Sequence, residues 1–259
     1  MKLSLSILTV DYLNVNESLK DMVKKSDYLH LDVMDGNFVP NISFGPAFIK
    51  SLRKIGDIPF DTHLMIQNPI DYIKVFAEAG SDLITIHPEA SSDVMETINL
   101  IHSFGKKAGI SIKPKTQVEE IKKYLPYVDL VLIMSVEPGF GGQKFMMSAV
   151  DKAKQLKELK TQNGYSYLIS MDGGINGETL GYVKDYLDLC VVGSYIVNAD
   201  DPMERIDIIT KMWRWKTGWL ILTSFFYAFF LFLIKVYNRN LVCKVHFYPH
   251  LWSVFIKIS

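Results

Sequence analysis

A histidine and an aspartate alternate along one short stretch of this chain. Residues 28–34 read Tyr-Leu-His-Leu-Asp-Val-Met, a composition typical of a β-strand. Because side chains on a strand repeat with a period of two, His30, Asp32 and Met34 are expected on one face, opposite apolar neighbours. Ionisable groups on a buried strand are costly unless they bind something, and a metal ion is the simplest partner.

Two more strand ends carry side chains of the same kind. His63 lies near the end of the predicted strand 59–65, and Asp172 directly follows the predicted strand 167–171. The alternative to a metal site is a self-contained polar network inside the protein. Neutral imidazoles and carboxylates at one point suit a divalent metal, with Zn²⁺ expected and Fe²⁺, Mn²⁺ or Co²⁺ also suitable. The predicted ligands are His30, Asp32, His63 and Asp172.

Three consecutive predicted loops are rich in glycine. Glycines let backbone N–H groups approach and wrap an anion, and parallel barrels commonly hold a phosphate at the loops after their last strands. Any one of these loops alone would be interpreted as an ordinary turn. Together they predict a phosphate site formed by Gly139, Gly141, Gly142, Gly173, Gly174, Gly193 and Ser194.

Short apolar runs alternate with amphipathic segments along residues 1–210. Strands are predicted at 3–9, 28–34, 59–65, 82–87, 108–112, 129–134, 167–171 and 189–193. Helices are predicted at 16–25, 46–54, 69–79, 91–104, 117–124, 146–161, 177–186 and 202–212. The alternation favours an α/β fold, a parallel (β/α)₈ TIM barrel. A doubly wound open sheet is the alternative, but its glycine-rich loop usually follows the first strand.

Charge divides the chain into two parts. All 28 Asp and Glu and 21 of the 28 Lys and Arg lie within residues 1–210, so this part is acidic and lacks a basic patch for nucleic acid. The two cysteines, Cys190 and Cys243, indicate no disulfide framework, and the N-terminal segment does not resemble a signal peptide. A reducing, cytoplasmic location is therefore expected.

Residues 211–259 are expected to form a basic, hydrophobic and aromatic tail outside the barrel. They contain seven Lys and Arg, no Asp or Glu, and all four Trp. Residues 217–234 are uncharged, and a helix of that length would span about 27 Å, slightly less than a ~30 Å hydrocarbon core. Three interpretations stay open: a membrane anchor, a helix packed against the barrel or a partner chain, or sequence not selected with the barrel, such as a translated frameshift.

Four other polar residues have plainer interpretations. Asp35 is expected to cap the turn after its strand, and Asp61, at the start of its strand, is expected to be structural. His87 ends a predicted strand and is placed at the rim of the site, whereas His102 lies in a helical pattern and is expected at the surface.

Four segments carry a resemblance to a known family. They are 30–41 (HLDVMDGNFVPN), 61–65 (DTHLM), 134–143 (MSVEPGFGGQ) and 172–176 (DGGIN). In this order and spacing the chain resembles the ribulose-phosphate 3-epimerase family from residue 1 to about residue 210. The departures are mild, since Asn37 stands where many members have His and Leu5 where many have Pro.

The resemblance implies a (β/α)₈ barrel that interconverts D-ribulose 5-phosphate and D-xylulose 5-phosphate, in the pentose phosphate pathway. It places the metal on the four ligands named above and makes Asp32 and Asp172 the catalytic acid and base. In the family's first strand a serine contacts substrate, which here is Ser6. The remaining expected substrate contacts, besides the phosphate site, are His63 and three methionines that end strands, Met34, Met65 and Met134.

General chemistry also supports the implied epimerisation, independently of the family resemblance. Epimerisation next to a ketone removes the carbon-3 proton and returns one to the opposite face, which a carboxylate on each side of a planar enediolate can do. A metal neutralises the developing charge. Two other functions stay open: an epimerase for a six-carbon ketose phosphate such as allulose 6-phosphate, and a membrane-tethered, non-catalytic sugar-phosphate binder. A homo-oligomer and a membrane contact through the tail are further possibilities.

Overall fold

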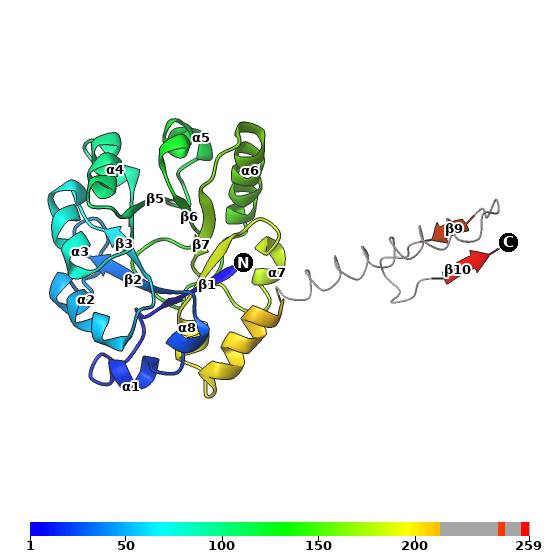
Figure 1. Ribbon diagram of the computed structural model, residues 1–259, viewed down its shortest axis with the longest axis horizontal. Helices are drawn as coiled ribbons and strands as arrows, with labels where there is room; N and C mark the ends of the chain where they lie inside the picture. The colour runs from blue at the N-terminus through cyan, green and yellow to red at the C-terminus, as the bar shows by residue number, and fades with distance from the viewer. Residues whose placement is uncertain (213–242, 247–254, 259) are drawn as a thin grey trace. The chain divides into compact units, whose positions relative to one another are not determined.

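Eight parallel strands close into a barrel in which neighbours in sequence pair with one another and β8 pairs with β1 (Figure 1). The computed structural model describes residues 1–212, 243–246 and 255–258. The barrel strands are β1 (Lys2–Ser6), β2 (Tyr28–Met34), β3 (Phe60–Met65), β4 (Leu83–Ile86), β5 (Lys107–Ile112), β6 (Leu130–Met134), β7 (Leu168–Asp172) and β8 (Leu189–Val192). The predicted (β/α)₈ barrel is confirmed.

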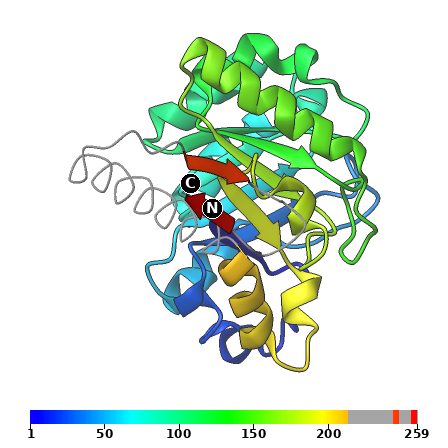
Figure 2. The same cartoon turned by 90° about the vertical axis from the view of Figure 1, so that its right-hand side faces the viewer.

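Helices surround this ring of strands, and the 90° view shows α6 lying along the outside of the sheet (Figures 1 and 2). They are α1 (Val15–Leu19), α2 (Pro46–Leu52), α3 (Ile73–Ala79), α4 (Val94–Ser103), α5 (Val118–Ile121), α6 (Ser148–Asn163), α7 (Leu180–Val183), α8 (Ser194–Val197) and a helix over 202–212. Several are shorter than predicted because 3₁₀ turns replace their ends, at Val23–Lys25, Arg53–Ile55, Pro69–Tyr72, Pro88–Ala90 and Lys122–Tyr127. The short helix α8 was not predicted from the sequence.

The first strand ends three residues earlier than predicted. It stops at Ser6 instead of residue 9 because the chain then turns, with the Val10 N–H donating to the Ile7 carbonyl at 3.1 Å. The Leu8 N–H also approaches Ser6 Oγ at 3.4 Å. This turn brings Leu8 and Thr9 to the mouth of the barrel, where they line a pocket described below.

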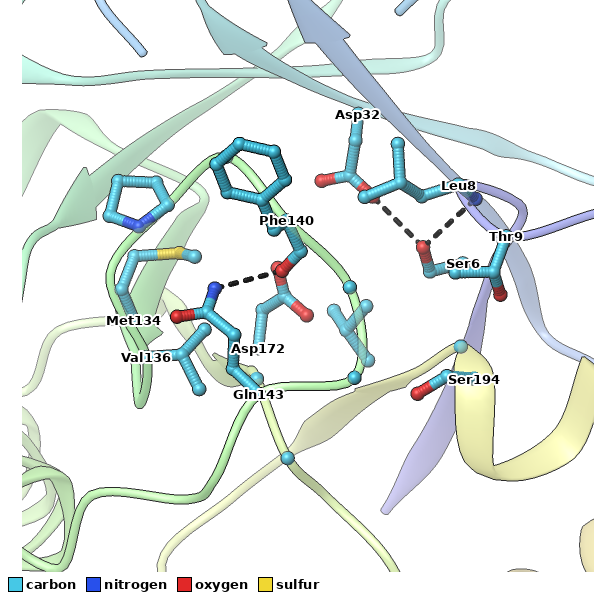
Figure 3. A pocket seen from close by; sticks show the side chains of 18 of the residues that line it. Ser6, Leu8, Thr9, Asp32, Met134, Val136, Phe140, Gln143, Asp172 and Ser194 are labelled. Atoms are coloured by element: carbon cyan, nitrogen blue, oxygen red, sulfur yellow. Dashed lines mark hydrogen bonds between the residues drawn. The ribbon is translucent and has the colours of Figure 1, made fainter. Parts of the chain in front are cut away.

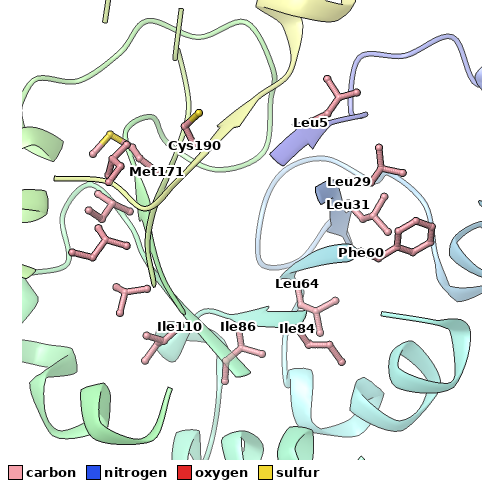
Figure 4. Close-up of a cluster of buried hydrophobic side chains, with 14 of the residues drawn as sticks. Leu5, Leu29, Leu31, Phe60, Leu64, Ile84, Ile86, Ile110, Met171 and Cys190 are labelled. Carbon is pink, nitrogen blue, oxygen red and sulfur yellow. The ribbon is translucent and has the colours of Figure 1, made fainter. Parts of the chain in front are cut away.

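Apolar side chains fill both sides of the sheet. Alternate strand residues such as Leu29 and Leu31 point out of the ring toward the helices and belong to one large buried cluster (Figure 4). A second cluster includes Tyr28, Leu83, Leu130, Leu132, Leu189 and Val191. Strands that are buried on both faces are typical of parallel sheets, and every residue of β2 is buried. The polar residues of β2 are therefore largely removed from bulk water.

The chain divides into two compact units, Met1–Trp213 and Arg214–Ser259. In the second unit, β9 (Cys243–His246) and β10 (Phe255–Ile258) pair antiparallel, with Cys243 opposite Ile258. The candidate membrane helix 217–234 lies outside the described residues. Among the residues that are described, no helix is both long enough and apolar enough to cross a membrane.

Close packing of β4 against β5 yields a prediction about Gly109. A Cβ atom at Gly109 would lie 2.3 Å from Thr85 Oγ1 and 3.2 Å from Thr85 Cα. Gly109→Ala should therefore lower the free energy of unfolding by about 1–3 kcal/mol, the usual cost of overpacking, as measured by denaturant titration. Gly181→Ala is the matched control, because Gly181 in α7 has open space around its Cβ position. Equal stability of the two variants would contradict this packing.

Candidate active site

Three strands bring the four predicted metal ligands together at the carboxyl end of the barrel. Asp32 on β2 pairs in register with His63 on β3, and His30 precedes Asp32 on the same face of β2. Asp172 is the last residue of β7, on the other side of the ring. One ligand atom from each residue lies within 4.8 Å of every other. Closure of the barrel thus unites residues from distant parts of the sequence.

The donor atoms of this cluster suit a divalent metal. His30 Nε2 and His63 Nδ1 lie 3.2 Å and 3.3 Å from the same oxygen, Asp32 Oδ1, and His30 Nε2 lies 4.0 Å from Asp172 Oδ2. His30 Nε2 is buried and makes no hydrogen bond to any residue that the structure describes. Two imidazole nitrogens and two carboxylates match the ligands that Zn²⁺ and related ions accept. The residues therefore fit a divalent ion.

Mutual charge perturbs the titration of the whole cluster. Burial alone would lower the pKa of His30, but the Asp61 and Asp32 carboxylates outweigh burial and raise that pKa well above its ordinary value. Burial alone would raise the pKa of Asp32, yet His30 and His63 hold it below its usual range. Burial, and then repulsion by Asp32, raise the pKa of Asp172 to about 7. The carboxylates thus attract positive charge, which a proton on His30 supplies in part and which a bound cation would supply.

A second layer of polar side chains lies behind the two histidines. His30 Nδ1 contacts Asp61 Oδ2 at 2.7 Å, and the same oxygen accepts a hydrogen bond from Ser4 Oγ at 2.9 Å. His63 Nε2 contacts His87 Nε2 at 2.8 Å. The sequence analysis missed Asp61, although the period of two already places it on the same strand face as His63. It also placed His87 at the rim, whereas His87 is fully buried beside His63.

A pocket opens directly over Asp32 and Asp172 (Figure 3). Ser6 Oγ donates a hydrogen bond to Asp32 Oδ2 at 2.8 Å and holds that carboxylate toward the pocket. Every predicted substrate-binding residue lines the pocket except His63, which lies behind Asp32: Ser6, Met34, Met65, Met134, Gly139, Gly141, Gly142, Gly173, Gly174, Gly193 and Ser194. The lining also includes residues that were not predicted, namely Leu8, Thr9, Val136, Pro138, Phe140, Gln143, Ile175 and Val191.

The wall of this pocket away from the metal cluster is built from glycine-rich loops. Gly173 and Gly174 both have positive φ, +114° and +61°. A Cβ at Gly174 would lie 2.6 Å from the backbone nitrogen of Phe145, so only glycine lets the two loops meet. None of the residues lining the pocket is Lys or Arg. An anionic group there would therefore depend on backbone N–H groups and hydroxyls.

Two plainer interpretations from the sequence, those of Asp35 and His102, are confirmed. Asp35 caps the turn after β2, since its Oδ1 accepts from the backbone nitrogens of Asn37 and Phe38 at 2.8 Å and 2.9 Å. His102 lies at the surface with its side chain 41% exposed. Cys190 is a buried free thiol, and burial raises its pKa to about 12.

The raised pKa of Asp172 predicts a pH-dependent stability for the metal-free protein. The carboxyl ionises near pH 4 in the unfolded chain but near pH 7 in the folded chain, so the parent loses stability as pH rises between these values. Asp172→Asn cannot ionise. Its free energy of unfolding relative to the parent should rise from pH 4 to pH 7 and stay constant above that. Denaturant titrations in the presence of a chelator measure this difference, and a pH-independent difference would contradict it.

Comparison with known proteins agrees with this site. The sequence model of the Ribulose-phosphate 3 epimerase family matches residues 2–197. The chain is 42% identical over 212 residues to the ribulose-phosphate 3-epimerase of Bacillus subtilis (strain 168), an alignment covering 81% of this chain and 98% of that protein. The ribulose-phosphate 3-epimerase of Treponema pallidum (strain Nichols) is 42% identical over 191 residues, covering 73% and 88%.

A solved structure shows the same fold at low sequence identity. The 3-hexulose-6-phosphate synthase from Salmonella typhimurium superposes with a TM-score of 0.64 at 19% identity, covering 82% of this chain and 98% of that one. This similarity concerns the barrel alone, whereas the family match spans the barrel strands and the ligand-bearing motifs. The chain belongs to the ribulose-phosphate 3-epimerase family.

Proposed function

We propose that this chain is a ribulose-phosphate 3-epimerase that interconverts D-ribulose 5-phosphate and D-xylulose 5-phosphate. The observation that carries the proposal is the composition of the pocket. At one end two carboxylates line the pocket and two imidazoles lie beside them, with one ligand atom of each residue within 4.8 Å of every other. The loops opposite are rich in glycine and contribute no cation. A pocket with ionisable groups at one end and glycine-rich loops at the other suits a small ketose phosphate. Its reacting carbons would lie at the ionisable groups, and its phosphate would lie at the loops.

The cluster would hold one divalent metal, with Zn²⁺ the expected ion. His30, Asp32, His63 and Asp172 are the ligands in this proposal. When bound, the metal supplies a Lewis acid that stabilises negative charge developing on the substrate oxygens. Its positive charge also lets both carboxylates lie close together in spite of their repulsion.

Asp32 and Asp172 are proposed to move the proton. Their positions on β2 and β7 place them at different walls of the pocket, so a planar intermediate can lie between them (Figure 3). One carboxylate removes the carbon-3 proton, and the other delivers a proton to the opposite face. Ser6 orients Asp32 through its 2.8 Å hydrogen bond. The roles of the two carboxylates exchange when the reaction runs backward.

The rest of the pocket would bind and shield the substrate. Met34, Met65 and Met134 are each no more than 4% exposed and line the pocket, so they form an apolar wall that excludes water from the reacting carbon. The substrate phosphate would be held at Gly141, Gly142 and the loops after β7 and β8. This contact would fix the position of the substrate in the pocket, so that carbon 3 lies between the two carboxylates.

The other two functions considered from the sequence gain no support. A six-carbon ketose phosphate would use the same carboxylates, and relative turnover of five-carbon and six-carbon substrates distinguishes the two. A non-catalytic binder would be expected to lack one of the four ligand-type residues, and all four are present.

Substitution of one carboxylate tests the proposed mechanism. Asp172→Asn should lower kcat by at least about 10²–10⁴-fold, the usual contribution of a general acid–base group. It should also abolish exchange of solvent deuterium into carbon 3 of one epimer only. Asp71→Asn, at an exposed residue, is the control and should keep parental turnover. Near-normal turnover of the Asp172 variant would refute the mechanism.

We propose that residues 1–210 are the catalytic domain and that residues 211–259 take no part in the reaction. The tail adds 14 aromatic residues and no acidic residue, which would promote aggregation in water. Truncation after Met212 should leave kcat within a few-fold and increase the soluble fraction. In cells, the full chain should sediment with membranes or be degraded, whereas the truncated chain should stay in the cytosol. Unfolding of the truncated barrel would show that the tail is a packed element.

A further inference from the structure

Each imidazole of the metal cluster is contacted at the ring nitrogen that faces away from the cluster. His30 is contacted at Nδ1 by Asp61, and His63 is contacted at Nε2 by His87. We propose that Asp61 and His87, the latter backed by Glu89, are positioning residues that fix the tautomers in which His30 Nε2 and His63 Nδ1 offer their lone pairs to the metal. This inference deepens the proposed function, because it concerns the same site.

Asp61 determines the tautomer of His30 by its chemistry. A carboxylate only accepts hydrogen bonds, so the 2.7 Å contact requires the His30 proton on Nδ1. Ser4 Oγ, at 2.9 Å, donates to the same oxygen and holds it in place. Asp61 is 1% exposed, and its other oxygen finds no partner in the part of the chain that the structure describes. Burial of a carboxylate with this one strong contact is costly, which indicates that the contact itself has a role.

The contact between His63 and His87 allows only one donor. If His63 Nδ1 binds a metal, the His63 proton must lie on Nε2, and His87 Nε2 must accept it at 2.8 Å. The His87 proton then lies on Nδ1, which is 3.5 Å from Glu89 Oε2. In the opposite arrangement, the His87 Nδ1 lone pair would face the Glu89 carboxylate. The charge of Glu89 therefore favours the arrangement with the His63 proton on Nε2, in which a metal would take the place of the 3.3 Å contact between His63 Nδ1 and Asp32 Oδ1.

Glu89 is itself held in place by the next loop. Its Oε1 accepts a short hydrogen bond from Thr116 Oγ1. The loop that carries Thr116 is tied to α6 by Lys152, whose ammonium donates to the carbonyls of Lys113, Pro114 and Thr116 at 2.8, 2.8 and 2.6 Å. Because other residues hold the Glu89 carboxylate in place, its charge can determine which ring nitrogen of His87 carries the proton.

The sheet explains why the two histidines use different nitrogens. His30 and Asp61 are register partners on neighbouring strands, so Asp61 reaches Nδ1, the ring nitrogen nearer the backbone. His87 directly follows the last residue of β4 and contacts His63 at Nε2, the imidazole nitrogen farther from the backbone. Asp61 is fixed by strand pairing and His87 is attached directly to the end of a paired strand, which suits a positioning role better than contacts from a mobile loop would.

Zinc affinity tests the proposal without reference to turnover. Apoprotein prepared with a chelator is titrated with Zn²⁺ against a chromophoric competitor, and its thermal unfolding is recorded. Asp61→Leu, His87→Phe and Glu89→Gln should each weaken zinc binding, and loss of such supporting contacts costs about 10–100-fold. His87→Gln should restore most of the affinity lost in His87→Phe, because its amide oxygen can accept from His63 Nε2.

Matched controls come from a similar pair at the surface. His102 Nε2 lies 2.9 Å from Asp129 Oδ2, with both side chains about two-fifths exposed. Asp129→Leu and His102→Phe remove the same groups and should leave zinc affinity unchanged. Should Asp61→Leu fail to fold, the milder Glu89→Gln and the His87 pair still decide the outcome.

Nitrogen-15 NMR of the zinc-loaded protein gives an independent readout. It should show His30 bound through Nε2 and protonated at Nδ1, and His63 bound through Nδ1 and protonated at Nε2. The opposite assignment for either ring would overturn the proposal. Folded Asp61→Leu or His87→Phe with parental zinc affinity would overturn it as well and leave the proposed function standing. A parent protein that binds no zinc would overturn both.

Discussion

The burial of two carboxylates and two imidazoles at one point is the constraint on which the rest of this structure depends. Each group alone would be costly to remove from water. Together they compensate each other only in part, since His30 and His63 stabilise the charge of Asp32 whereas Asp172 retains a raised pKa of about 7. A divalent cation would complete this compensation, because the cluster has the residues to hold one.

The barrel supplies the rigidity that such a cluster requires. Three strands carry the four residues, and every strand is hydrogen-bonded on both sides because the sheet is closed. Apolar side chains pack the outward face against the helices, so a shift of β2 relative to β3 would disturb that packing as well as the site. Packing of the whole core therefore opposes small displacements of the four candidate metal-ligating side chains.

Strands and loops contribute different kinds of groups to the pocket. Ionisable groups come from strand residues, whose positions are determined by register, whereas the opposite wall consists of loops with glycines at positive φ. A substrate that is anchored by backbone N–H groups at one end leaves all the charged side chains free for the reacting end. Because the pocket lining contains no lysine or arginine, an anionic group at the loops would be held by backbone N–H groups and hydroxyls, while the two acids lie beside the proposed metal.

Local patterns determined much of this protein from the sequence alone. The alternation His30, Asp32, Met34 places three side chains on one face of a strand whatever the fold, and the eightfold repetition of strand and helix identifies the barrel. Strand β2 has the predicted bounds, and its apolar and polar residues alternate from Leu29 to Val33. Short helices were harder to predict: α8 spans four residues, too few for a periodic pattern.

Only the tertiary structure decided which side chains meet. The sequence places Asp61 and His87 thirty-one and fifty-seven residues from His30, and nothing local indicates that one contacts His30 and the other the neighbouring His63. Those contacts follow from register and barrel closure, which are set by packing over the whole chain. The pKa of Asp172 has the same origin, since burial and the charge of Asp32 act across the ring. Residue types are local, whereas distance, burial and electrostatic coupling arise only when the chain folds.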